Sequence, residues 1–428
     1  MKKLAIFSTS LLSSAVMAAM PVNQPVGSSF TLSSAPNIRA LSTVHGNPAA
    51  PFLMVNQDDN DSFRFGILGP LSIGVEMGDV SDLGDRAEEI EKILDATYTS
   101  KTQAEDALKK ADDILKKIGQ TAYLKTTLSM QVPFMPIIYK TQDKGAFMLD
   151  ASLSGVAKGS VIADTIKLNS SSNTELTSDT SFYAQTATDL KVGFGYSQAV
   201  WENSHGMLIG GVKANLHQIS LGRGTVALDD QSDKAEDAIS DAISDDAVSS
   251  TGVGLDLGTV WVSNYYQVGL TLANINEPEF DGAPIKQNCA TKSCSAANGL
   301  VTAGKLAATD KYVKEMQTTV DFAVSTKGKQ VTLGLSYDAN EVKDAVGDEY
   351  QWAAASLSYN GDSHFIPGLR IGFRQNMAGT ELSYASAGLT ILKRLNIDLA
   401  VALDTVVDED GDELPRGGFF SIGYDTAF

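Results

Sequence analysis

The chain ends in GFFSIGYDTAF, residues Gly418–Phe428, and this stretch decides the fold. Apolar side chains alternate here with small or polar ones. The apolar set comprises Phe420, Ile422, Tyr424 and Phe428, with Thr426 as an interruption, and the opposite set comprises Ser421, Gly423, Asp425 and Ala427. Because successive side chains of a strand point to opposite faces, one face suits lipid and the other a polar lumen. The pattern predicts the last strand of an outer-membrane β-barrel.

Thirteen further stretches with this alternation precede it. The expected strands are 63–77, 122–138, 145–157, 188–201, 206–222, 251–263, 264–275, 316–326, 329–339, 350–359, 368–377, 384–392, 396–406 and 418–428. Connections after even-numbered strands are short, whereas those after odd-numbered strands are often long, as at 79–121, 157–187, 223–250, 276–315 and 406–417. Outer-membrane barrels show this alternation of short periplasmic turns and long extracellular loops. We therefore expect an all-β antiparallel barrel of about 14 strands over residues 63–428.

The N-terminus predicts export. Lys2 and Lys3 precede an apolar run, Leu4–Leu12, and a small-residue site at Val16–Ala18, which is the pattern of a signal peptide over residues 1–18. No later run approaches the roughly 20 apolar residues that a spanning helix needs. An exported barrel is expected in the outer membrane of a Gram-negative bacterium. Its expected partners are membrane lipid and the barrel-assembly machinery, which would engage the final strand.

The composition excludes one class of partner. The 428 residues carry a formal net charge of -19, and the sequence has no basic stripe. Binding to phosphates requires clustered Lys and Arg, so a direct nucleic-acid partner is not expected. The 37 glycines and 43% hydrophobic residues suit a barrel in which apolar and small side chains alternate.

Strand parity predicts which charged side chains face the lumen. The candidates are Asp150, Lys191, Lys213, Asp256, Asp321, Arg370, Arg374, Asp398 and Asp404. They would line either a charged pathway or an internal ion-pair network. Mixed signs favour the network, because opposite charges neutralise one another away from water.

Residues 19–62 precede the first strand and are long enough to form a hatch or plug inside the barrel. They contain Asn47-Pro48-Ala49. Asn-Pro also starts turns, so the tripeptide by itself fits a simple turn equally well. With the strand count and the length of this segment, it resembles the long-chain fatty-acid transporters, which are 14-stranded barrels with an Asn-Pro-Ala hatch motif. That resemblance implies a hatch-gated channel for small hydrophobic molecules.

The layout resembles more closely the TraF-like group of plasmid conjugal-transfer barrels, a branch of the same superfamily. The resemblance rests on the element His45–Ala50, the strand Phe63–Met77, the acidic helical insertion from Asp79 and the final strand ending in Phe428. It spans nearly the whole mature chain. A periplasmic thioredoxin-like conjugation protein shares the name, but its Cys-x-x-Cys is absent here. The resemblance implies location and architecture, with conjugation components as implied partners.

Three long connections carry further predictions. Residues 79–121 are expected to form a helical hairpin, with Leu83, Ala87, Ile90 and Leu94 on one helix and Leu108, Ala111, Leu115 and Ile118 on the other. Residues 223–250 are expected to form an acidic loop. In the loop 276–315, Cys289 and Cys294 are expected to form a disulfide, because an exported protein meets oxidising conditions.

The last acidic run, with Asp408, Asp410 and Asp412, resembles part of a calcium-binding loop, but it lacks the twelve-residue spacing and the distal Glu of such a loop. A solvated loop is the preferred interpretation, and no metal or other cofactor is expected. An enzyme is not expected either. Of four histidines only His217 is placed by a strand, facing the lumen with Lys213 and Asn215, and its immediate neighbours supply no obvious serine nucleophile on that face.

Three functions stay open from the sequence. The first is a non-enzymatic TraF-like outer-membrane protein with a role in conjugal transfer or cell-surface contact. The second is the hatch-gated hydrophobic channel, and the third is a secreted soluble β-rich binding protein.

Overall fold

The computed structural model describes residues 26–55, 62–79, 86, 88–90, 92–93, 96, 101–141, 145–168, 176–228, 246–285, 289, 291–361, 363–407 and 411–426. The expected signal peptide, Asp408, Asp410 and Phe428 therefore lie outside the described residues. So do most of the acidic loop and the hairpin residues Leu83, Ala87 and Leu94.

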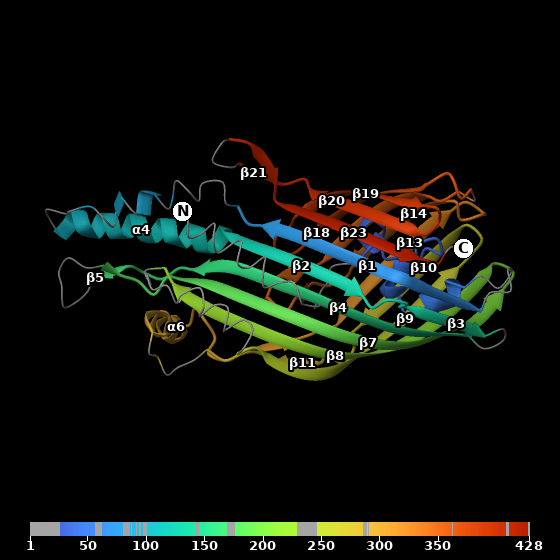
Figure 1. Ribbon diagram of the computed structural model, residues 1–428, viewed down its shortest axis with the longest axis horizontal. Helices are drawn as coiled ribbons and strands as arrows, with labels where there is room; N and C mark the ends of the chain where they lie inside the picture. The colour runs from blue at the N-terminus through green and yellow to red at the C-terminus, as the bar shows by residue number, and fades with distance from the viewer. Residues whose placement is uncertain are drawn as a thin grey trace.

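A single antiparallel sheet closes on itself to form the barrel (Figure 1). In chain order its strands are β1 (Phe63–Met77), β2 (Tyr123–Gln131), β3 (Ile137–Thr141), β4 (Gly145–Ile162), β7 (Ser181–Asn203), β8 (Gly206–Ala227), β9 (Val248–Val262), β10 (Tyr266–Ala273), β13 (Gln317–Ser325), β14 (Val331–Asp338), β17 (Trp352–Tyr359), β18 (Gly368–Asn376), β19 (Ser383–Ile391), β20 (Leu395–Ala402) and β23 (Gly417–Asp425). Because β2 and β3 share one place between β1 and β4, the barrel has the expected 14 strand positions.

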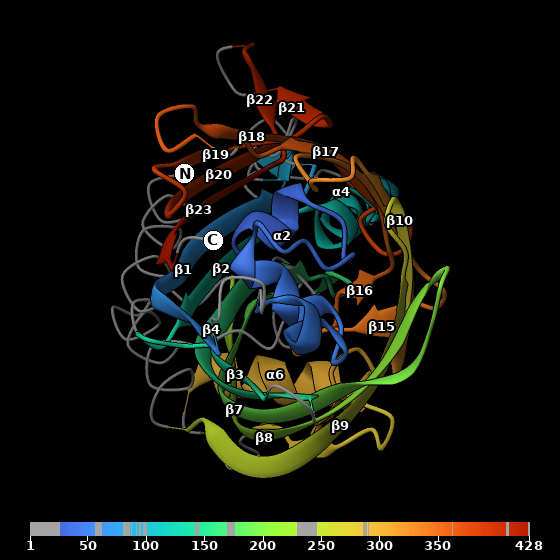
Figure 2. The same ribbon diagram turned by 90° about the vertical axis from the view of Figure 1, so that its right-hand side faces the viewer.

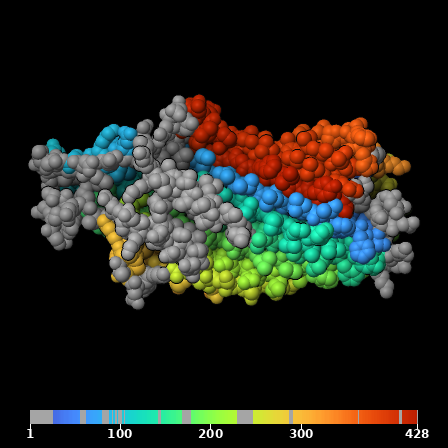
Figure 3. All heavy atoms as spheres, in the orientation of Figure 1, coloured from blue at the N-terminus to red at the C-terminus, as the bar shows by residue number. Residues whose placement is uncertain are grey.

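The closing seam joins the first and last strands. β1 pairs antiparallel with β23, with Ile73 opposite Phe420. Figure 3 shows them as neighbouring bands, blue beside red, on the outer face. This closure pairs the two edges of the sheet with each other. A sheet in lipid requires such closure, because an open edge would leave backbone groups without hydrogen bonds.

Alternation of the side chains follows the prediction along the last strand. Phe420 is 42% exposed on the outer face, and Ile422 and Tyr424 are partly exposed on the same side. Phe419, Ser421 and Asp425 are buried on the inner face. Large apolar side chains on the outside of most other strands make the wall lipid-compatible.

One predicted strand is interrupted. The strand expected over 122–138 is divided into β2 and β3 by residues 132–136, which include Pro133 and Pro136. Proline cannot donate to a strand ladder, and Phe134 has a φ of 67°, outside the strand region. The pairing of both pieces with β1 and β4 keeps the wall continuous.

The wall is much taller on one side. β4, β7 and β8 contain 18, 23 and 22 residues, whereas β17, β18, β19 and β20 contain 8 or 9. β4, β7 and β8 are longer than the strands expected over 145–157, 188–201 and 206–222. The connection expected to begin at residue 223 therefore begins only after Ala227. Figure 1 shows the extra length pointing toward the end that carries α4 (Lys101–Thr121) and α6 (Lys292–Thr302).

Short strand pairs occupy several long connections. They are β5 (Lys167–Leu168) with β6 (Leu176–Thr177), β11 (Glu279–Asp281) with β12 (Lys311–Val313), β15 (Val342–Lys343) with β16 (Glu349–Tyr350), and β21 (Thr405–Val407) with β22 (Glu413–Pro415). None of these pairs has the length of a membrane-spanning strand.

The helices lie in these connections as well. α4 matches the second expected helix, and Ile90 and Ile93 pack against its buried Ala111 and Leu115. α6 was not expected, because its Ser, Ala and Gly content shows no apolar periodicity. Thr291 begins it by accepting the Cys294 backbone N–H at 3.3 Å. No described helix has both the length and the apolar character to cross a membrane.

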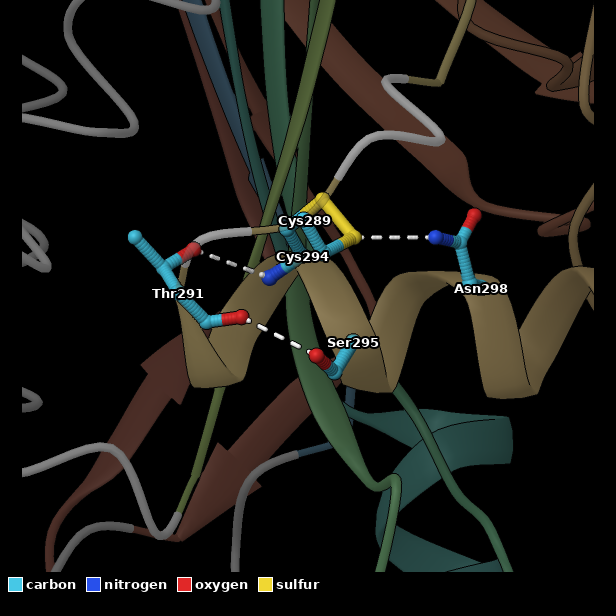
Figure 4. The surroundings of a disulfide bond; sticks show 5 residues. All are labelled: Cys289, Thr291, Cys294, Ser295 and Asn298. Atoms are coloured by element: carbon cyan, nitrogen blue, oxygen red, sulfur yellow. Dashed lines mark hydrogen bonds between the residues drawn. A yellow bond between two sulfur atoms is a disulfide. The ribbon is translucent and has the colours of Figure 1, made fainter.

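The expected disulfide joins Cys289 to Cys294 at the start of α6 (Figure 4). Asn298, one turn further along the helix, donates its side-chain N–H to Cys289 Sγ at 2.9 Å. The bridge therefore fixes the chain to the first turns of α6.

Candidate functional site in the barrel lumen

Residues 26–55, called the N-terminal segment below, lie inside the barrel (Figure 2). The segment contains α2 (Ser28–Thr31) and two 3₁₀ helices, η2 (Leu41–Gly46) and η3 (Ala50–Leu53). Arg374 of β18 donates to the carbonyls of Ser29 at 2.9 Å and Leu32 at 3.0 Å, and its guanidinium lies over the Phe30 ring. One inward arginine therefore holds the first turn of the segment.

A buried ion pair continues this attachment. Arg370 of β18 and Asp398 of β20 are each 1% exposed, with Nη2 of the arginine 3.0 Å from Oδ2 of the aspartate. Asp398 Oδ2 also accepts the Ser28 hydroxyl at 2.8 Å. The same carboxylate therefore joins two wall strands to the segment, which gives a buried charge the partners that it needs.

The Asn-Pro-Ala tripeptide docks on the opposite wall. Asn47 is fully buried and donates its side-chain N–H to the carbonyls of Thr259 and Leu270, both at 3.3 Å. A Cβ on Gly211 would lie 2.1 Å from the Pro48 carbonyl oxygen, and one on Gly258 would lie 2.2 Å from Asn47 Oδ1. Glycines in β8 and β9 thus make the socket, which the sequence pattern did not reveal.

A second ionic group forms around Asp150, which is fully buried. Its Oδ2 lies 3.5 Å from Lys191 Nζ, 3.3 Å from Lys213 Nζ and 3.4 Å from His45 Nδ1 of the N-terminal segment. Gln131 Nε2 donates to its other oxygen. Three of the residues that parity placed in the lumen therefore meet, in an ion-pair arrangement.

The remaining lumen candidates differ in where they lie. Asp256 accepts the Asn215 side-chain N–H at 2.6 Å and faces the lumen, and Asp321 is 1% exposed inside the wall. Asp404 is not in the lumen. It is exposed and accepts the Ser383 backbone N–H at 3.0 Å, because β20 ends at Ala402 and the strand alternation ends with it.

Between the N-terminal segment and the wall lies a cavity of about 280 Å³, called the lumen cavity below. Most of the residues that line it are of polar type, and they include Asp189, Lys191, Lys213, Asn215, His217 and Lys314. His217 Nδ1 lies 2.8 Å from Asp189 Oδ2, with the two side chains 1% and 2% exposed. Sequence reasoning missed Asp189 and Lys314, although Asp189 has the same strand parity as Lys191.

A second cavity of about 320 Å³, the mouth cavity, is lined by Arg223, Tyr312, Glu315 and Asp344, among other residues. The β15–β16 connection lines it and reaches into the barrel, where Val346 joins an inner cluster with Val156. Lys125 of β2 donates to Asp344 at 2.5 Å and to Asp348 at 2.7 Å. Lys158 of β4 also pairs with Asp348. These four groups are called the lysine clamp, and none was singled out from the sequence.

The two lysines of the clamp determine the direction of the pKa shift of Asp348. Burial acts to raise the pKa of Asp348, but the ammonium groups of Lys125 and Lys158 outweigh it and hold the pKa below its ordinary value. Lys125 is only 2% exposed, so its charge depends on these carboxylates.

An apolar cluster lies between the two cavities. His217, which lines the lumen cavity, has its ring 6.2 Å from that of Phe280, and Phe280 stacks on Tyr312, which lines the mouth cavity, at 6.1 Å. Val156, Ile219 and Val346 complete the cluster. Polar cavities therefore lie on both sides of an apolar partition.

The part of the chain that the structure describes contains no group of three or more His, Cys, Asp or Glu arranged to hold a metal ion. Of the weak calcium candidates only Asp412 is described, and it is exposed.

A closed antiparallel wall with an apolar outer face and a polar, occupied lumen defines an outer-membrane-type β-barrel. Within that class, residues 44–338 match the family model described as "F plasmid transfer operon, TraF, protein". The chain belongs to this family.

Comparison with solved structures finds barrels of similar extent. A FadL homologue from Pseudomonas aeruginosa is 13% identical, with 96% of this chain and 100% of that chain covered and a TM-score of 0.43. The toluene transporter TodX from Pseudomonas putida is 11% identical, with 96% and 99% covered and a TM-score of 0.42. A comparison with curated proteins finds no match.

Proposed function

We propose that the protein is a non-enzymatic component of the outer membrane of a Gram-negative bacterium that acts in cell-surface contact during conjugal plasmid transfer. The observation that carries this proposal is the tall side of the wall. A membrane-spanning strand needs about 9–11 residues. β7 has 23 residues, so about half of it projects from the membrane together with β4 and β8.

The direction of the projection supports the same function. The projecting ends of β4 and β7 lie at the long-connection end, with α4, α6 and the disulfide, while β7 and β8 are joined at the other end by a turn at residues 204–205. Long connections of outer-membrane barrels are extracellular. The projecting wall therefore offers a structured surface to a neighbouring cell. The family description names a plasmid transfer operon, which agrees with this role.

Mating efficiency tests the proposal. Donor cells would carry the intact protein, no copy, or a variant with residues 80–121 replaced by a short turn. A variant shortened at residues 405–416, on the low side of the wall, is the matched control. We expect the first deletion to lower plasmid transfer as much as loss of the protein, and the control to transfer normally. Transfer that does not depend on the protein at all would contradict the proposal. Gel mobility with and without heating would verify that each barrel folds.

The two cavities favour a second candidate, a channel gated by the N-terminal segment. Each cavity has room for a small solute, and the apolar partition would be the barrier between them. The charged side chains that line the lumen cavity disfavour the hydrophobic solutes that a fatty-acid-transporter likeness implies. A secreted soluble binder is disfavoured by the apolar outer wall, which would associate in water. Conductance of the purified barrel in planar bilayers separates a channel from a closed surface component.

A further inference from the structure

Several residues that line the lumen cavity have buried polar atoms without a hydrogen-bond partner among the described residues, and three of these atoms belong to neighbouring side chains of β7 and β8. These three are His217 Nε2, Asn215 Oδ1 and Asp189 Oδ1. All three residues line the cavity, and they are 1%, 4% and 2% exposed respectively. Buried polar atoms are nearly always paired in folded proteins, so their convergence on one cavity indicates a ligand site.

Their hydrogen-bonding roles follow from their neighbours. A carboxylate only accepts, so His217 Nδ1 donates to Asp189 Oδ2 at 2.8 Å and leaves Nε2 of the neutral ring as an acceptor. Asn215 donates its N–H to Asp256 at 2.6 Å, which leaves Oδ1 as an acceptor. Asp189 Oδ1 accepts as well. The set therefore requires donors from a ligand.

Small residues opposite these side chains keep the site open. Gly193 of β7 pairs with Asn215, and a Cβ there would lie 2.8 Å from Asn215 Oδ1 and 2.7 Å from Lys213 Cε. Gly254 of β9 also faces Asn215, and its Cβ would lie 3.4 Å from His217 Nε2. Side chains at these positions would press on the groups that face the cavity.

The same cavity also supplies donors. Lys191, Lys213 and Lys314 line it, and each ammonium has three N–H groups. Their carboxylate contacts are loose, at 3.5 Å and 3.3 Å from Asp150 and 3.8 Å from Asp189. The acidic groups Asp189 and Asp256 offset much of their charge, so the site does not demand a strongly charged ligand.

We propose that the lumen cavity binds a small, uncharged polyhydroxylated solute of about monosaccharide size. A hydroxyl group both donates, as the three acceptors require, and accepts, as the ammonium groups require. An ionised carboxylate has no hydrogen to donate to the acceptors, and a quaternary ammonium has no atom that accepts from the lysines. The volume of about 280 Å³ lies near the lower end of ligand-site volumes, roughly 300–1,000 Å³. This inference goes beyond the proposed surface-contact function and does not rest on it.

Equilibrium dialysis of the full mature barrel in detergent tests the proposal, with labelled glucose as the probe and choline and citrate as charged comparisons. We expect saturable glucose binding, one per barrel, with little binding of the charged probes. His217→Gln and Asn215→Leu are each expected to weaken glucose binding at least tenfold. Asp321→Asn, which changes a buried lumen carboxylate outside the cavity lining, is the matched control and should bind as the unmodified protein does.

Absence of saturable glucose binding would overturn the proposal. Preferential binding of choline or citrate would overturn the ligand class, and binding unaffected by folded His217 and Asn215 variants would overturn the site. Heat-dependent gel mobility checks the fold of each variant. If both substitutions prevent folding, the comparison of the three probes on the unmodified barrel still decides. Mating efficiency is measured separately, so failure here leaves the proposed function to its own test.

Discussion

At the residue scale, the position of the N-terminal segment depends on where the wall lacks a side chain. Gly211 faces inward on β8, where the Pro48 carbonyl occupies the space that a Cβ would take. Gly210, its neighbour, faces outward, and a Cβ there would meet only Val200 Cγ1 at 3.5 Å, an ordinary contact. Two adjacent glycines therefore have different structural roles.

Gly211→Ala is expected to displace Pro48 and loosen the segment, because a methyl group 2.1 Å from a backbone oxygen cannot be accommodated without a shift. The free energy of unfolding should fall by about 1–3 kcal/mol, as for other overpacked sites. Urea unfolding followed by heat-dependent gel mobility measures this change. Gly210→Ala should leave the midpoint unchanged, and equal midpoints for both variants would contradict the docking of Pro48.

At the element scale, the β15–β16 connection owes its inward position to the lysine clamp. Lys125 and Lys158 face the lumen from β2 and β4, and the connection brings Asp344 and Asp348 to them. Lys343 and Glu349 of the same strand pair form only an exposed contact at 3.4 Å. The buried contacts therefore hold the connection in place, since exposed pairs contribute little.

The clamp is expected to release in acid. The pKa of Asp348 is lower in the folded protein than its ordinary value of about 3.9, so its contribution is fully present above that pH and is lost as the pH falls through the lowered pKa. Planar-bilayer conductance should stay constant from pH 7 to about 4 and should rise as the pH falls below that value. Asp348→Asn should conduct more already at pH 7.

Glu349→Gln, on the same strand pair, is the control and should keep the unmodified pH profile. A conductance that is insensitive to both acid and Asp348→Asn would show that the connection is held by other contacts.

At the scale of the whole molecule, different interactions hold the wall of the barrel and the N-terminal segment inside it. The wall closes through strand pairing from β1 round to β23, while the N-terminal segment attaches through side chains such as Arg374 and Asp398. Closure of the hydrogen-bond ladder does not require the segment. Polar side chains of the inner face, however, make hydrogen bonds to the segment.

Removal of residues 26–55 is expected to leave a barrel that still shows heat-dependent gel mobility but conducts more and unfolds more easily. Arg374 alone would lose its hydrogen bonds to the carbonyls of the segment, and a hydrogen bond to a charged group contributes roughly 1.5–3 kcal/mol. Conductance and thermal midpoint, compared with the intact mature protein, measure both effects. Loss of the barrel itself would show that the segment is required for closure.

The two-residue alternation of apolar and polar side chains in the sequence predicted the strands of the wall and their outer and inner faces. Alternation at Phe420, Ile422 and Tyr424 predicted the outer face, and alternation elsewhere predicted Asp150, Lys191 and Lys213 as inner residues that the structure brings together. Such predictions succeed because the two-residue repeat of a strand is a local property. They fail where a strand ends or breaks, as at Asp404 and at Pro133 and Pro136.

The sequence by itself therefore determined the class of fold, the number of strand positions and the disulfide, since each follows from neighbouring residues. Only the tertiary structure decided the contents of the lumen. Lys125 meets Asp348 at a sequence separation of 223 residues, and Asn47 meets Thr259 at a separation of 212. Such contacts depend on strand register, on the path of long connections and on where glycine leaves room. These are properties of the closed barrel, and no local pattern encodes them.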